Sequence, residues 1–144
     1  MKNHISFKHE RGQSLVEFAI SLTAILILLA GAVDFGIGLF HYVAMRDAAQ
    51  DGALYGSMNP DNAAGIQDRI KNAAGGSGMI YDLYASGDLT ASVTYTGAHC
   101  EGNGITVTLS YDYPISMPFI GAFVGEFIRL RASVTDTILT PPCP

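Results

Sequence analysis

The sequence predicts an α+β protein in which one long N-terminal helix carries a small three-stranded antiparallel sheet. Two observations predict this fold class. Residues 14–56 contain no proline and start with an almost unbroken apolar run that extends to Val33. In the C-terminal part, apolar and polar residues alternate over 89–95, 105–111 and 127–134, and such alternation is typical of half-buried strands.

The long helix is predicted over residues 13–56 and would measure roughly 60 Å, about twice the thickness of the hydrocarbon core of a bilayer. We expect it to be transmembrane to about residue 40, because the rings of Phe40, His41 and Tyr42 suit a membrane interface. It would continue outside for several turns and end at Met58-Asn59-Pro60.

Small residues recur every four positions along this helix and would let another helix or a sheet approach closely. Two alternatives stay open for the outer set, which begins at Ala44: packing on the sheet of its own domain, or close approach by a neighbouring helix or sheet. The candidate helix-packing residues are Ala32, Gly36, Ala48, Gly52 and Gly56.

Shorter elements follow the long helix. A second helix is predicted over 62–74, with Asp61 or Asn62 as its cap and with Ile66 and Ile70 on one face. The segment 80–84 is ambiguous between helix and strand. The three strands come next, and the last is expected to continue to about residue 138.

The connection between the last two strands contains the most apolar stretch outside the predicted span, residues 116–125. A stretch of this kind indicates either a partner or membrane contact, or a short core helix that crosses the sheet. Its candidate contact residues are Phe119, Ile120, Phe123 and Val124.

Charge and composition limit the classes of partner. Hydrophobic residues make up 49% of the 144 residues, the net charge is −5, and only five of the eight Lys/Arg follow Gly12. Nucleic acid is therefore not an expected partner, because its binding requires clustered cations. Lys2, Lys8 and Arg11 precede the span and only Arg46 follows it closely, which predicts a cytoplasmic N-terminus in a single-pass protein of the cytoplasmic membrane.

The two cysteines, Cys100 and Cys143, would lie on the oxidising side of that membrane. A disulfide between them is favoured over two free thiols. It would close a loop of about forty residues and stabilise the outer domain by about 3–4 kcal/mol.

Catalytic motifs are lacking in the sequence. It contains no His-x-x-x-His, no Gly-x-Ser-x-Gly and no phosphate-binding glycine loop. His99 and Glu101 flank Cys100 in a glycine-rich loop, where a solvated loop is favoured over a weak metal site. We expect no enzyme activity, no cofactor and no metal.

Residues 11–18 read Arg-Gly-Gln-Ser-Leu-Val-Glu-Phe, and this motif opens the apolar run. A secretory signal peptide is disfavoured, because its core is shorter, lacks an acid and ends in a small-residue cleavage site. The motif resembles the class III signal of type IV pilins and pseudopilins. The resemblance implies that a prepilin peptidase cuts between Gly12 and Gln13, and that Glu17 stays with the helix as the fifth mature residue.

Two further motifs allow the resemblance to pilins and pseudopilins to be assigned to one family. They are Val33-Asp34-Phe35-Gly36 and the run from Arg46 to Ala53. Together they resemble the TadE-like family of pseudopilins, which accompany the Flp pili of tight-adherence systems. The resemblance is close over residues 11–56, looser over 104–138 and lacking over 57–103. It implies three parts: a cleavable leader (1–12), the long helix (13–56) and an extracytoplasmic α+β domain (57–144).

The resemblance also implies a structural role in pilus assembly and adhesion, with the protein in the membrane or in the extracellular pilus. The implied partners are the prepilin peptidase, other pseudopilin or pilin subunits, and a membrane assembly platform with its ATPase. The Glu17 carboxylate would meet the freed amine of Gln13 on a neighbouring subunit, and water or a neighbour's serine would satisfy Asp34. Two alternatives remain: the main filament subunit, or an uncleaved, membrane-anchored binding module.

Overall fold

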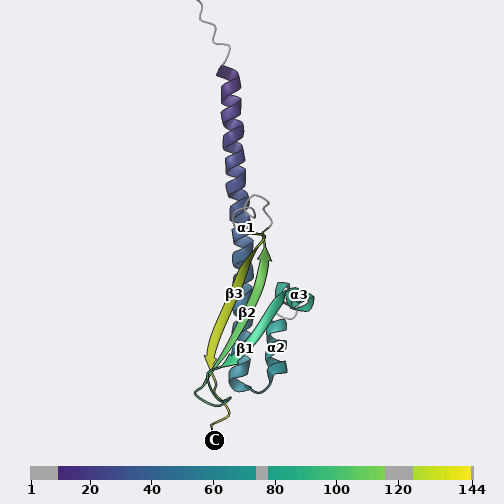
Figure 1. Ribbon diagram of the computed structural model, residues 1–144, viewed down its shortest axis with the longest axis vertical. Coiled ribbons are helices and arrows are strands. Elements are labelled where there is room, and N and C mark those ends of the chain that lie inside the picture. Colours follow the sequence, from purple (N-terminus) through teal and green to yellow (C-terminus); the bar gives the residue numbers. More distant parts are fainter. Residues whose placement is uncertain (1–9, 74–77, 116–124, 144) are drawn as a thin grey trace, which may run out of the picture.

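The computed structural model describes residues 10–73, 78–115 and 125–143. Figure 1 shows that the N-terminal half of the first helix projects alone, whereas its C-terminal half lies against the sheet and two short helices. The α+β fold with a three-stranded antiparallel sheet is as predicted. In chain order the elements are α1 (Glu10–Met58), α2 (Ala63–Lys71), α3 (Met79–Ser86), β1 (Leu89–Tyr95), β2 (Gly104–Pro114) and β3 (Phe127–Thr137).

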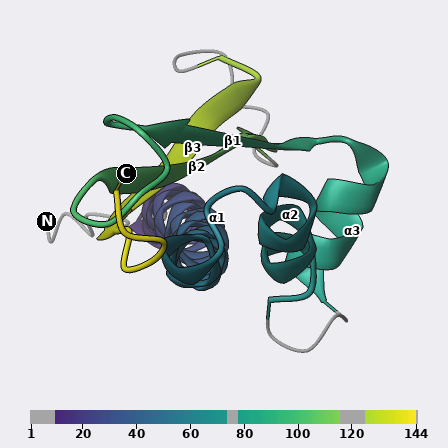
Figure 2. The same cartoon turned by 90° about the horizontal axis from the view of Figure 1, so that it is seen from below.

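The sheet has the strand order β1-β2-β3 with both pairs antiparallel. Its register places Val93, Val107 and Val134 in one row across the three strands. Seen along the long axis, one face of the sheet covers α1 and α2, which lie side by side, and α3 lies beyond them (Figure 2). No helix among the described residues covers the opposite face, which explains why each strand alternates apolar and polar residues.

The core of the domain lies between the C-terminal half of α1, α2 and the inner face of the sheet. Most of the α1 residues that enter it are small, and this allows the helix to lie close to its neighbours. The fully buried apolar residues are Met45, Ala48, Ala49, Ala53, Ile66, Ile70, Ile105, Val107, Leu109 and Ile138.

Details of the short elements refine the predictions. Asn62 caps α2, because its Oδ1 accepts a hydrogen bond from the Gly65 N–H at 2.9 Å, and Ile66 and Ile70 form the buried face. The helix ends at Lys71 rather than at residue 74. The ambiguous segment 80–84 is helical and belongs to α3. The candidate contact residues Phe119, Ile120, Phe123 and Val124 lie outside the described residues.

Candidate functional site

The N-terminal half of α1 is apolar and exposed on all sides. No residue of its most apolar window is buried within the chain, and the helix is long and apolar enough to cross a membrane. Water around such a surface is unfavourable, so this half of α1 requires lipid or another apolar surface. Its exposed large side chains include Leu15, Phe18, Ile20, Leu22, Ile25, Leu26, Leu29, Val33 and Phe35.

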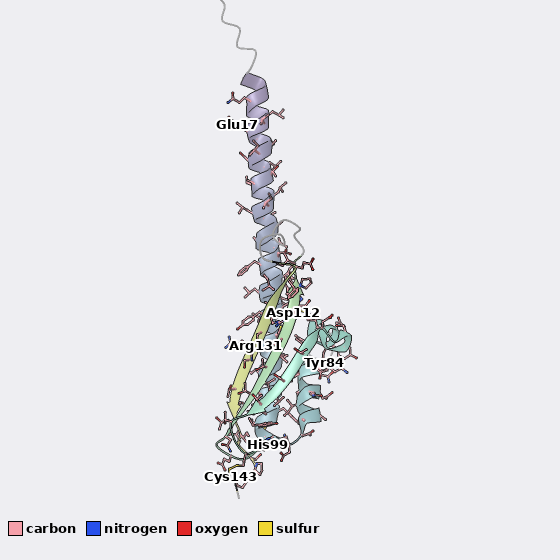
Figure 3. The ribbon with its side chains drawn as sticks, in the orientation of Figure 1. Glu17, Tyr84, His99, Asp112, Arg131 and Cys143 are labelled. Carbon is pink, nitrogen blue, oxygen red and sulfur yellow. A yellow bond between two sulfur atoms is a disulfide. The ribbon has the colours of Figure 1, made fainter. Side chains whose placement is uncertain are left out.

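Glu17 is the only charged residue between Gly12 and Asp34. Figure 3 shows its side chain projecting from the lone part of α1. Within the chain its Oε1 accepts a hydrogen bond from Gln13 Nε2 at 3.3 Å, one helical turn away. A carboxylate at this depth in an apolar helix is costly unless a partner stabilises it.

Gly12 and Gln13, the predicted cleavage site, lie in the first turn of α1. A Cβ built on Gly12 would have no heavy atom within 4 Å outside the helix's own backbone, so the described chain leaves open space on this side of Gly12. Glycine also weakens a helix by about 1 kcal/mol relative to alanine. The first turn can therefore open at low cost.

The predicted helix-packing residues fall into two groups. Ala48, Gly52 and Gly56 are buried in the domain: a Cβ on Gly52 would lie 2.6 Å from Ile70 Cγ1, and one on Gly56 would overlap Ile105 Cδ1. These three residues thus pack on their own α2 and sheet. Ala32 and Gly36 are exposed in the lone half of α1, and a Cβ on Gly36 would meet nothing within 4 Å.

Asp34 lies beside a groove between α1 and the end of the sheet. The groove has a volume of about 370 Å³ and is lined by apolar side chains from both sides, among them Phe35, Tyr113 and Ile128. Asp34 Oδ2 is buried and has no hydrogen-bond partner among the residues that the structure describes. An unsatisfied buried carboxylate oxygen is costly, so Asp34 is a polar group that needs a partner or water.

The end of the domain far from the exposed half of α1 is held by the C-terminal tail. Cys100 and Cys143 form a disulfide there. The Leu139 N–H donates to the Ser57 carbonyl oxygen at 2.8 Å, and Thr140 Oγ1 donates to the Met58 carbonyl oxygen at 2.9 Å. The tail therefore ties the last turn of α1 to the loop between β1 and β2.

A second tie joins the same loop to the connection between α1 and α2. His99 Nδ1 lies 2.7 Å from Asp61 Oδ1, and the His99 ring lies on Tyr95 with 3.8 Å between centroids. Tyr95 Oη donates to the Pro60 carbonyl oxygen at 2.6 Å. Burial, and secondarily the Asp61 carboxylate, raises the pKa of Tyr95. Within the described ranges, no three His, Cys, Asp or Glu side chains gather as a metal site would require.

The outer face of the sheet carries an ion pair that sequence reasoning missed. Arg129 donates from Nε and Nη2 to the two oxygens of Asp112, at 2.8 and 3.1 Å. The hydrogen bond from Arg129 lowers the pKa of the Asp112 carboxyl. Alternation alone places both residues on the outer face, but only the strand register makes them direct partners. The contact between Asp61 and His99 could not be predicted from the sequence either, because no local pattern connects the two residues.

Comparison with known proteins bears on α1. No curated protein and no solved structure matches the chain significantly. A family model described as "TadE-like protein" matches residues 12–54, which begin at the predicted cleavage site and end within the buried half of α1. Over residues 12–54, the chain is therefore similar to the TadE-like family, and this is the family that the sequence motifs predict.

Proposed function

We propose that this protein is a structural, pilin-like subunit of a tight-adherence pilus machine. The observation that carries the proposal is the division of α1: its N-terminal half is apolar and exposed on all sides, while its C-terminal half forms the core of a folded domain. A helix built in this way can stand in a bilayer or in a bundle of equivalent helices. The family name suggests association with a tight-adherence pilus.

Processing is the first step of the proposed cycle. A prepilin peptidase at the cytoplasmic face of the membrane would cut the bond between Gly12 and Gln13. The low helix propensity of Gly12 and the open space at its Cβ position favour local opening of this turn. Cleavage would remove the basic leader and create a positively charged amine at Gln13, four residues before Glu17.

Assembly is the second step. A membrane platform driven by its ATPase would move the helix from lipid into a bundle of neighbouring pilin-like subunits. Apolar contacts among helices would replace lipid contacts, and the Glu17 carboxylate of one subunit would pair with the Gln13 amine of the next. Both charges would then be neutralised away from water, and this pairing would set the axial offset between subunits.

Intact mass measurement tests the proposal. The full-length protein is expressed with an active prepilin peptidase and recovered from membranes, next to a Gly12→Leu variant. We expect the mass of residues 13–144 for the native sequence and of residues 1–144 for the variant. A native chain that keeps its leader would contradict the pilin-like role and favour an anchored binding module.

The abundance of this chain in filaments distinguishes a minor subunit from the main filament subunit. Filaments sheared from cells are expected to contain this chain at a small fraction of the main subunit. If it were the most abundant filament protein, the minor role would be wrong, although the pilin-like assignment would stand.

A further inference from the structure

The end of the sheet nearest the exposed half of α1 has an unusual surface. Phe127, at the start of β3, is 54% exposed, and the following Ile128 is 43% exposed. The next outward-facing residues along β3 are Arg129, Arg131, Ser133 and Thr135. This face is therefore apolar at that end and polar beyond it, where Arg129 is paired with Asp112 of β2 and is followed by Arg131 and the hydroxyl side chains (Figure 3 labels Asp112 and Arg131). A bilayer surface changes in the same sense, from apolar acyl chains to polar headgroups and water.

The same end of the sheet reaches the level at which the apolar run of α1 stops. Tyr113, the register partner of Ile128, lies against α1 at Gly38, where a built Cβ would be 3.8 Å from Tyr113 Cε1. Ile128 lines the groove beside it together with Asp34 and Phe35 of α1. Figure 1 shows this end of β2 and β3 alongside the middle of α1.

The length of the apolar run sets the depth of this contact. Leu15–Val33 spans about 28 Å of helix, close to the ~30 Å hydrocarbon core of a bilayer. If α1 crosses the membrane, as the proposed function requires, Asp34 lies at the outer boundary of that core. The end of the sheet then lies within the headgroup layer.

We propose that the sheet end, formed by Pro114, Ile115, Phe127 and Ile128, is seated in the outer headgroup layer as a second membrane contact of this protein. This inference rests on the membrane span of the proposed function. The lipid surface covers the exposed side chains of Phe127 and Ile128. Burying apolar side chains 5–10 Å into such a layer is typical of interfacial segments.

Two carboxylates limit how deep the sheet end can go. Glu126 is exposed directly before Phe127, and Asp34 lies on the facing side of the groove. Neither is stable as an unpaired anion in hydrocarbon, so the sheet end stays among the headgroups. Extraction of α1 into a filament must therefore also release this contact from the membrane.

The chain contains no tryptophan, so single tryptophan variants can report depth without background. The full-length protein is placed in phosphatidylcholine vesicles that contain lipids brominated at defined positions along the acyl chain. Phe127→Trp reports the sheet end, Phe18→Trp reports the span, and Thr94→Trp on the outer face of β1 is the matched control.

We expect Phe127→Trp to emit at shorter wavelength than Thr94→Trp and to lose intensity with lipids brominated near the headgroup. Phe18→Trp is expected to be quenched as well, whereas Thr94→Trp is expected to keep its intensity. The near-ultraviolet circular dichroism of the tyrosines shows whether each variant keeps the native fold. If Phe127→Trp does not keep it, Ile128→Trp is used instead, with the same expected result.

Two negative results are distinguishable. If Phe18→Trp is quenched and the sheet-end tryptophan is not, the sheet end stands in water; the inference is then overturned while the span and the proposed function remain. If Phe18→Trp is also unquenched, α1 does not cross the membrane, and the proposed function fails together with the inference.

Discussion

Single glycines decide how closely α1 can approach the rest of the domain. Gly52 faces Ile70 and Gly56 faces Ile66 and Ile105, and these isoleucines are all fully buried. A side chain at either glycine would need space that a close-packed core does not contain. By contrast, Gly36 has no neighbour within the described chain, so its small size matters only for lipid or for another subunit.

Gly52→Ala is expected to destabilise the outer domain by about 1–3 kcal/mol, because its Cβ would overlap Ile70. Gly36→Ala is the matched control and is expected to leave the stability of the domain unchanged. Urea unfolding of the full chain in detergent, followed by tyrosine circular dichroism, measures both. Equal midpoints for the two variants would contradict the close approach of α1 to α2.

The pKa of Asp112 offers a second prediction at the residue scale. The hydrogen bond from Arg129 lowers this pKa, so the carboxylate contributes to stability above the unfolded pKa of about 3.9, and the contribution is lost as the pH falls through the lower folded value. Arg129→Gln is expected to raise the pKa of Asp112, as measured by NMR titration of the carboxyl carbon. Arg131→Gln should leave it low. An unchanged pKa in Arg129→Gln would show that the ion pair does not form in solution.

At the scale of elements, the C-terminal tail joins the last turn of α1 to the β1–β2 loop at one end of the domain's core. β3 is followed by residues that hydrogen-bond to the last turn of α1 and to the β1–β2 loop, and the disulfide lies in the same place. A small domain with a single sheet has limited core area, so such cross-links contribute a large share of its stability.

The double variant Cys100→Ser/Cys143→Ser is expected to lose about 3–4 kcal/mol of stability, because the disulfide closes a loop with a sequence separation of 43 residues. The native protein in reductant should show the same loss. Denaturant unfolding measures both, and the variant should be insensitive to reductant. A loss below about 1 kcal/mol would mean that the hydrogen bonds of the tail hold it without the disulfide.

At the scale of the whole molecule, one continuous helix performs two tasks. The C-terminal half of α1 is a core helix whose neighbours lie in the same chain. In the N-terminal half, no residue of the most apolar window is buried by the described residues. Because the helix contains no proline and no break, a force applied to the N-terminal half is transmitted directly to the domain. This continuity suits a subunit that is lifted out of a membrane.

Glu17→Gln tests the pairing that the proposed assembly requires. The variant is expected to insert in the membrane and to be cleaved, because the cut bond lies four residues earlier, but to lose copurification with other pilin-like subunits. Ser21→Ala, another exposed polar position one turn further along α1, should retain copurification. Retention of partners by Glu17→Gln would contradict the proposed pairing with the Gln13 amine.

Local patterns in the sequence were sufficient to predict the types of most elements. The long proline-free helix, a cap at Asp61 or Asn62 and the three alternating strands all depend on residues that are near one another in the chain, and periodicity reports such relations directly. Ile80–Tyr84 stayed ambiguous because a short apolar run is compatible with both helix and strand.

The sequence alone determined which faces are apolar, where a helix can cross a membrane and where α2 begins. Only the tertiary structure decided what those faces meet: α2 and the sheet for Gly52 and Gly56, Asp61 for His99, and Arg129 for Asp112. These partners are separated along the chain, and their contact depends on strand register and on how the layers pack. Register and packing are set by the whole domain, so no local spacing of residues contains them.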